Sequence, residues 1–176
     1  MAVDREKLDA LMYQNDSLDW WQPARFREHI KPQLPSDIEI IADPPPASEN
    51  YNCFLYALGL ARNHTIRAET HGFIYDTFVH TLLAHDELIQ TDLPRADDFI
   101  LYQDAVRYQD RITHIGIIEA DGRIRSKWAW GPLVRHQPLD VPKEFGDDIF
   151  YVQYISTGHA VELYERYQFF NQKPET

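Results

Sequence analysis

The order of predicted elements indicates an α+β fold in which helices come first and an antiparallel sheet follows. Helical spacing of apolar residues dominates before about residue 90, and strand-like segments dominate from residue 99 onward. Helices followed by a run of strands are typical of this class, whereas α/β folds alternate the two. The chain has 176 residues, of which 44% are hydrophobic, so we expect one compact domain.

The first half of the chain carries helical patterns around one short strand. Residues 3–14 show apolar residues at helical spacing, and residues 38–41 are typical of a strand. Three consecutive prolines within residues 43–50 exclude a helix or a central strand and predict an extended loop. A buried helix is predicted over residues 53–62, with Asn52 as its N-cap, and a second over residues 73–90.

The second half predicts an antiparallel meander closed by a helix. The sheet is expected to include a hairpin that turns at Asp121-Gly122. Strands are predicted over residues 99–103, 113–120, 123–130, 133–137 and 148–155, and a helix over residues 159–170. The domain then divides into an N-terminal helical extension (1–42), a core that holds the candidate catalytic residues (43–158), and a C-terminal helix and tail (159–176).

Charge and composition argue against several classes of protein. A formal net charge of −11 repels phosphate backbones and anionic membranes, so we expect no nucleic-acid partner. No apolar stretch reaches the length of about 18 residues that a transmembrane helix needs. The opening residues show no signal-peptide pattern, which favours the cytoplasm, although export by a signal-free route stays open. The spacing of histidines and cysteine fits no metal motif, and we expect no cofactor.

Cys53, the only cysteine of the chain, is the candidate nucleophile. It follows the proline-rich loop and a helix-capping asparagine, so it is expected in the first turn of a helix, where exposed N–H groups lower a thiol pKa. A buried structural thiol is the alternative interpretation. Among eight histidines, His114 is the candidate base because it opens an apolar strand that would hold an imidazole rigidly. A strand-end histidine without a catalytic role is the alternative.

An ordered set of motifs resembles the NlpC/P60 superfamily of papain-like cysteine hydrolases, and in particular a set of uncharacterised bacterial NlpC/P60-like proteins. The set comprises YNCFLYALG, DDFILY, THIG, SKWAWG, His136 and Phe145-Gly146, and it covers roughly residues 50–155. The resemblance implies a papain-like fold, with Cys53 at the start of a helix and His114 at the start of a strand. It also implies a peptide-like or acyl substrate.

The chain departs from the family pattern at the third catalytic position. The family usually has histidine twelve residues after the base, where this chain has Ser126. Ser126 is expected to accept a hydrogen bond from the His114 ring, although a hydroxyl stabilises an imidazolium poorly. His136 is the alternative third residue.

Further residues near Cys53 are candidates for binding the substrate or its oxyanion. Tyr51 and Asn52 are candidate oxyanion donors beside the Cys53 backbone N–H. Lys127 is a candidate ligand of an acidic substrate group, as is Arg125, and a solvated strand face is the alternative for both. Trp128 shares a predicted strand face with Trp130, and the pair is expected either to line a groove or, by preference, to pack in the core.

Two functions remain open from the sequence. The first is a thiol-dependent hydrolase or acyltransferase that cleaves an amide or ester bond through Cys53 and His114. The second is a catalytically inactive binding module or effector domain on the same fold. The sequence predicts neither the identity of the substrate nor the oligomeric state.

Overall fold

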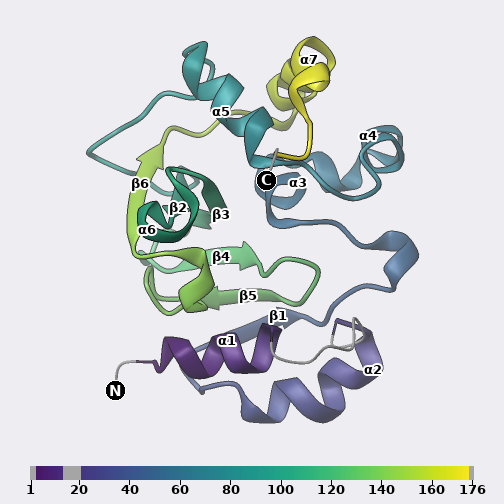
Figure 1. The fold of residues 1–176 in the computed structure, drawn as a ribbon, viewed down its shortest axis with the longest axis vertical. Helices are drawn as coiled ribbons and strands as arrows, with labels where there is room; N and C mark the ends of the chain where they lie inside the picture. Colours follow the sequence, from purple (N-terminus) through teal and green to yellow (C-terminus); the bar gives the residue numbers. More distant parts are fainter. Residues whose placement is uncertain (1–2, 14–20, 175–176) are drawn as a thin grey trace.

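A computed structural model, in which residues 3–13 and 21–174 are described, confirms the mixed α+β class (Figure 1). Its centre is a six-stranded antiparallel sheet with the strand order β1-β5-β4-β3-β2-β6. The strands are β1 (Glu39–Ala42), β2 (Phe99–Gln103), β3 (Ile112–Ile118), β4 (Ile124–Lys127), β5 (Leu133–His136) and β6 (Asp148–Val152).

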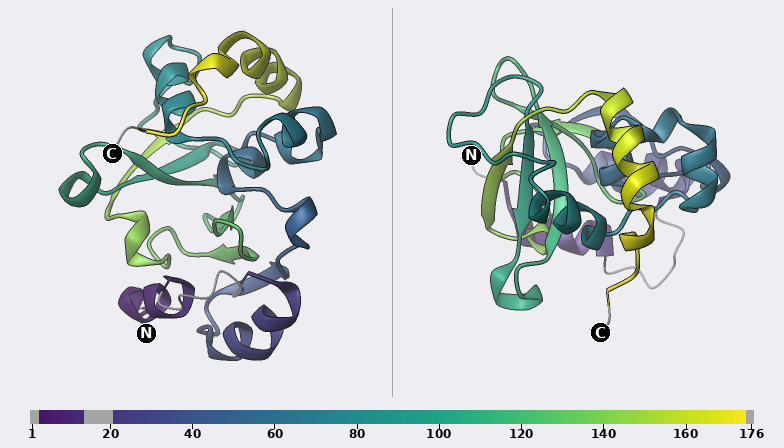
Figure 2. Two further views of the ribbon diagram at one scale, coloured as in Figure 1. Left: turned by 45° about the vertical axis from the view of Figure 1, so that its right-hand side comes forward. Right: turned by 90° about the horizontal axis from the view of Figure 1, so that it is seen from above.

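Helices lie at both ends of the molecule, with the sheet between them (Figures 1 and 2). At one end lie α3 (Cys53–Ala57), α4 (His64–Glu69), α5 (Asp76–Ala84) and α7 (Thr157–Tyr167). At the other lie α1 (Arg5–Tyr13) and α2 (Pro23–Arg25), which a π-helical turn (Phe26–Ile30) continues. A short helix, α6 (Ala105–Tyr108), follows β2. Short 3₁₀ turns cover Lys31–Gln33, Ala47–Glu49, Leu60–Arg62, Lys143–Phe145 and Gln168–Phe170.

The sheet separates two hydrophobic clusters, and β2 contributes alternate residues to them. Phe99 and Leu101 pack against the helices α3, α5 and α7, while Ile100 and Tyr102 pack against α1 and the π-helical turn. This alternation follows from the two-residue period of a strand. Both faces of β2 are therefore buried, in agreement with its continuous apolar sequence.

The sheet differs from a simple meander at its two edges. Strands β2 to β5 follow one another as predicted, but β6 returns to pair with β2, and β1 pairs with β5. The predicted N-terminal extension therefore contributes an edge strand as well as helices, and residue 42 is the last residue of β1.

Several predicted elements are shorter in the structure because of local backbone geometry. Helix α3 ends early because Gly59 adopts a left-handed conformation, with φ of 72°. Strand β4 ends at Lys127, and Ala129 has φ of 49° in the loop that follows. The pattern over residues 73–90 forms a helix only over Asp76–Ala84, and the sequence analysis did not predict α4 and α6.

Within the described residues, no helix is both long enough and apolar enough to cross a membrane.

Candidate active site

Cys53 is the first residue of α3, and Asn52 fixes it there. The Asn52 side-chain oxygen accepts hydrogen bonds from the backbone N–H groups of Leu55 and Ile74, at 3.3 Å each. Its amide donates to the Ile74 carbonyl at 2.7 Å. The predicted N-cap is thus confirmed, and it also ties the start of α3 to the segment before α5.

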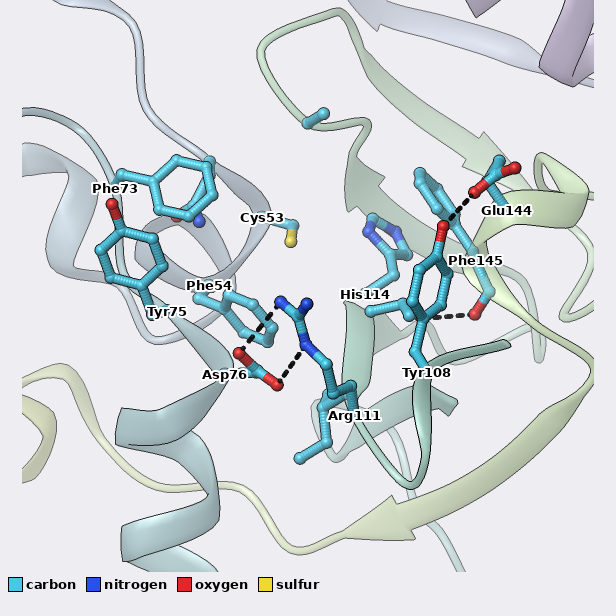
Figure 3. A pocket seen from close by; sticks show the side chains of 14 residues that line it. Cys53, Phe54, Phe73, Tyr75, Asp76, Tyr108, Arg111, His114, Glu144 and Phe145 are labelled. Carbon is cyan, nitrogen blue, oxygen red and sulfur yellow. Dashed lines mark hydrogen bonds and ion pairs between the residues drawn. The ribbon is translucent and has the colours of Figure 1, made fainter. Parts of the chain in front are cut away.

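His114 lies on a part of β3 that is not paired with β4. The two strands pair only at Ile117 with Arg125 and at Ile118 with Ile124. Helix α3 contacts both strands. Cys53 and His114 line the same cavity of about 330 Å³, and their side chains face each other across it (Figure 3).

Aromatic packing holds the imidazole of His114. Phe145 stacks on it with ring centroids 4.0 Å apart and an interplanar angle of 15°, and the Tyr102 ring lies 5.3 Å away. The His114 side chain is fully buried, and neither ring nitrogen has a hydrogen-bond partner among the described residues, Cys53 included. Packing therefore fixes the plane of the ring and leaves both nitrogens available.

The Phe145-Gly146 pair is held in place by backbone contacts. The single proton of the Thr113 hydroxyl is shared between the carbonyls of Tyr102 and Phe145. Gly146 has φ of 93°, and a Cβ at this position would lie 1.9 Å from the Gln103 carbonyl oxygen. Only glycine fits here, so Gly146 allows its neighbour Phe145 to reach the imidazole.

Burial keeps both reactive groups neutral at rest. It raises the pKa of the Cys53 thiol to about 12, against the opposing influence of the Ile115 and Phe54 backbone N–H groups and the Lys127 charge. Burial also holds the pKa of His114 well below its ordinary value, and the nearby His136 adds to this effect. Near pH 7 the pair is a thiol and a neutral imidazole, so the site begins in the form in which His114 can accept a proton.

The structure does not form the hydrogen bond predicted between Ser126 and His114. The Nδ1 atom of His136 lies 2.7 Å from the Gln137 carbonyl, which assigns the proton to Nδ1. The Ser126 hydroxyl therefore donates to Nε2 of His136, at 2.8 Å. A Cβ on Gly116 would lie 3.2 Å from that of Ser126, so the serine sits beside Gly116, two residues along β3 from His114.

Lys127 and Trp128 are buried inside the protein and do not line the Cys53 cavity. The Lys127 ammonium donates to the Asn50 side-chain oxygen at 3.0 Å and to the carbonyls of Ala129 and Gly131 at 3.1 and 2.6 Å. These three bonds use all of its protons, and burial lowers its pKa to about 7. Trp128 is fully buried in the cluster below the sheet, as the preferred core interpretation expected.

The other residues predicted to bind the substrate or its oxyanion either form hydrogen bonds within the protein or lie outside the Cys53 cavity. The Asn52 side chain is committed to the cap described above. Tyr51 and Arg125 line a different cavity, and Arg125 is paired with Glu119 at 3.5 Å. Trp130 packs edge-on against Trp21, with ring centroids 5.5 Å apart. Of the predicted oxyanion donors, the Cys53 backbone N–H remains, because the first N–H groups of a helix have no partner within it.

Comparisons with known proteins found no match to this chain among family models, curated proteins or solved structures. The resemblance to NlpC/P60 proteins stays a prediction from the motifs.

Three charged residues of the cavity, Arg111, Asp76 and Glu144, were not predicted from the sequence. Arg111 forms a two-point ion pair with the buried carboxylate of Asp76, at 3.2 and 3.4 Å. Glu144 accepts hydrogen bonds from the Tyr108 hydroxyl at 2.8 Å and from Arg107 at 2.6 Å. These residues come from separate segments of the chain, so no local motif marks them. Figure 3 shows Arg111 beside the space between Cys53 and His114, and Tyr108 on the other side of His114, next to Glu144.

Proposed function

We propose that the protein is a thiol-dependent hydrolase or acyltransferase with a papain-like arrangement of the NlpC/P60 kind. The observation that carries the proposal is the convergence of Cys53 and His114 on one cavity. A helix N-terminus holds the thiol, and an aromatic stack holds an imidazole whose two nitrogens have no partner among the described residues. This combination places a nucleophile and a base around the space where a carbonyl group would react.

The reaction follows from the resting protonation states. The Cys53 sulfur attacks the carbonyl carbon of an amide or ester while the thiol proton passes to a ring nitrogen of His114. The carbonyl electron pair moves to oxygen, next to the Cys53 backbone N–H. When this pair returns, the bond to the leaving group breaks, and the leaving group takes the proton from His114. Water or another acceptor then attacks the thioester carbonyl and gives its proton to His114. The carbon–sulfur bond breaks, and the Cys53 thiolate takes the proton from His114, which restores the thiol.

Peptide-like or small acyl substrates fit the cavity best. Its volume of about 330 Å³ lies at the lower end of ligand pockets. Its wall combines aromatic rings with the Arg111–Asp76 ion pair and the Glu144 carboxylate, so it offers both apolar and polar contacts to a short acyl chain.

A catalytically inactive binding module is the second candidate, and two observations favour it. Ser126 bonds to His136, so no described hydrogen-bond acceptor stabilises a protonated His114. The raised pKa of Cys53 also leaves little thiolate near neutral pH. In this alternative the cavity binds an acyl or peptide group without cleaving it.

Hydrolysis of p-nitrophenyl acetate tests the proposal, because this activated ester has an acyl group small enough for the cavity. Wild type should release p-nitrophenolate with turnover, and Cys53→Ala should lose on the order of 10³-fold or more of this rate. A melting curve by circular dichroism verifies that the variant is folded. Equal rates for wild type and Cys53→Ala would exclude the enzyme and leave the binding module.

A further inference from the structure

A second and larger cavity lies beside α3, outside the candidate active site. Its volume is about 960 Å³, and it shares no lining residue with the Cys53 cavity. Its wall is built by Tyr51, by residues between positions 56 and 67, by single residues of β2, β3, β4 and β5, and by residues at the start of α7 and just before it.

Positive charge gathers in this cavity although the chain as a whole is strongly acidic. Arg62, Arg67 and Arg125 line it together with His64, and Asp97 is the one carboxylate among its described lining residues. The formal net charge of the chain is −11, so a wall with three guanidinium groups and one carboxylate departs sharply from the average surface.

Two of these guanidinium groups lack a balancing carboxylate. Among the described residues, Arg62 has no hydrogen-bond or ion-pair partner. Arg67 contacts the Ala61 carbonyl at 3.4 Å and the Nδ1 atom of His64 at 3.2 Å, and it too makes no ion pair with a described residue. Elsewhere on the molecule arginines are mostly paired, as Arg135 is with Glu119 and Glu39. Two guanidinium groups without an ion pair to a described residue therefore line this one cavity.

Aromatic rings accompany the charges. Tyr51 and Tyr56 stack with ring centroids 6.4 Å apart and an interplanar angle of 14°, and Tyr154 also lines the cavity. Burial raises the pKa of both stacked tyrosines, while Arg62 acts in the opposite direction on each. The charge of Arg62 is thus close enough to influence both phenols, so ring faces and a free guanidinium border the same space.

We propose that this cavity binds a phosphorylated small molecule of nucleotide size that carries an aromatic ring. Guanidinium groups bind phosphate oxygens through two parallel hydrogen bonds, and several of them neutralise a polyphosphate. Tyrosine rings offer a stacking surface for a planar base. A volume of about 960 Å³ lies at the upper end of small-ligand pockets, which suits a nucleotide better than a free phosphate ion. The strongly acidic chain argues against a nucleic-acid polymer as the occupant.

Isothermal titration of the full chain with ATP, and separately with tripolyphosphate, tests the proposal. ATP should bind at one site and more tightly than tripolyphosphate, which carries the charge without the ring. The double variant Arg62→Gln/Arg67→Gln should weaken ATP binding by about tenfold or more. Cys53→Ala should bind ATP as wild type does, because the two cavities share no residue.

The matched control is Arg166→Gln, which removes an exposed arginine of α7 that is paired with Glu87 outside this cavity. It should leave ATP affinity unchanged within about twofold. Absence of ATP binding at millimolar concentration would overturn the proposal, as would equal weakening by Arg166→Gln and the double variant. Equal affinity for tripolyphosphate and ATP would overturn the assignment of an aromatic ligand. Melting curves of both variants verify that they are folded.

Discussion

The two cavities beside α3 differ in the charge and burial of their polar groups, although residues of this one short helix line both. Cys53 and Phe54, the first two residues of α3, line a small cavity in which the Cys53 thiol and the His114 imidazole are buried and neutral. Further along, Tyr56 and Ala57 line a larger cavity with unpaired guanidinium groups. Burial of neutral groups suits bond making, in which charge develops only during the reaction. Accessible fixed charge suits recognition of a ligand that is already charged.

The largest expected effect concerns His114, the proposed base in the small cavity. His114→Gln removes the proton acceptor, so p-nitrophenyl acetate hydrolysis should fall by about 10² to 10⁴-fold. Ser126→Ala should change the rate by no more than about threefold, because Ser126 bonds to His136 and not to His114. Steady-state rates of the two purified variants measure this contrast. A loss in Ser126→Ala as large as that in His114→Gln would show that the serine orients the base after all.

The next effect compares Gly146, which follows the lining residue Phe145 of the small cavity, with Gly59, which lines the large one. Gly146 and Gly59 both have positive φ, but a Cβ at Gly146 meets a backbone oxygen at 1.9 Å, whereas at Gly59 it meets the hydroxyl of Thr157 at 2.2 Å. The Thr157 side chain can rotate away from an added Cβ, whereas the Gln103 backbone is held in β2 and cannot. Gly146→Ala should therefore cost about 2–4 kcal/mol of unfolding free energy, and Gly59→Ala about 1–2 kcal/mol.

Urea unfolding monitored by tryptophan fluorescence measures both glycine variants. Equal losses would mean that Gln103 relaxes as easily as Thr157, and the rigid support of Phe145 against His114 would then be disproved.

A smaller and gradual loss of folding stability is expected on acidification. His136 is buried and its folded pKa is about 4, below the ordinary value of 6.5 that it regains on unfolding. Between these values the unfolded chain binds a proton that the folded chain does not, so stability is full above about pH 6.5 and falls as the pH drops towards 4. The loss is about 1.4 kcal/mol per pH unit for this group, and His114, whose pKa is also lowered, adds to it.

His136→Gln tests this contribution. The variant should show a shallower loss of stability between pH 6.5 and 4 than wild type does, as measured by urea unfolding at a series of pH values. Identical slopes would indicate that His136 takes up its proton in the folded protein at an ordinary pKa.

Features that depend on neighbours in the sequence were predictable. The cap at Asn52, the start of α3 at Cys53 and the position of His114 on a strand follow from local patterns, and the structure has all three. The α+β class was predictable for the same reason. The early end of α3 was not predictable, because nothing in the continuous apolar sequence indicates that Gly59 adopts a left-handed conformation.

Features that depend on strand register escaped the sequence analysis. Ser126 stands twelve residues after His114, but the β3–β4 ladder places it beside Gly116, and the β4–β5 pairing brings it to His136. The Arg111–Asp76 ion pair joins residues 35 positions apart. Tertiary packing decides such contacts, and no spacing rule along one chain specifies them.

Trapping of an acyl-enzyme tests whether Cys53 is the nucleophile and His114 its base. Wild type and His114→Gln are mixed with p-nitrophenyl acetate, quenched in acid at successive times, and analysed by intact mass and peptide mapping. We expect one acetyl group, located on Cys53, that forms at least about a hundredfold more slowly in His114→Gln. Acetylation at other residues only, or equal rates on Cys53 in the two proteins, would contradict the assignment of Cys53 as the nucleophile and His114 as its base.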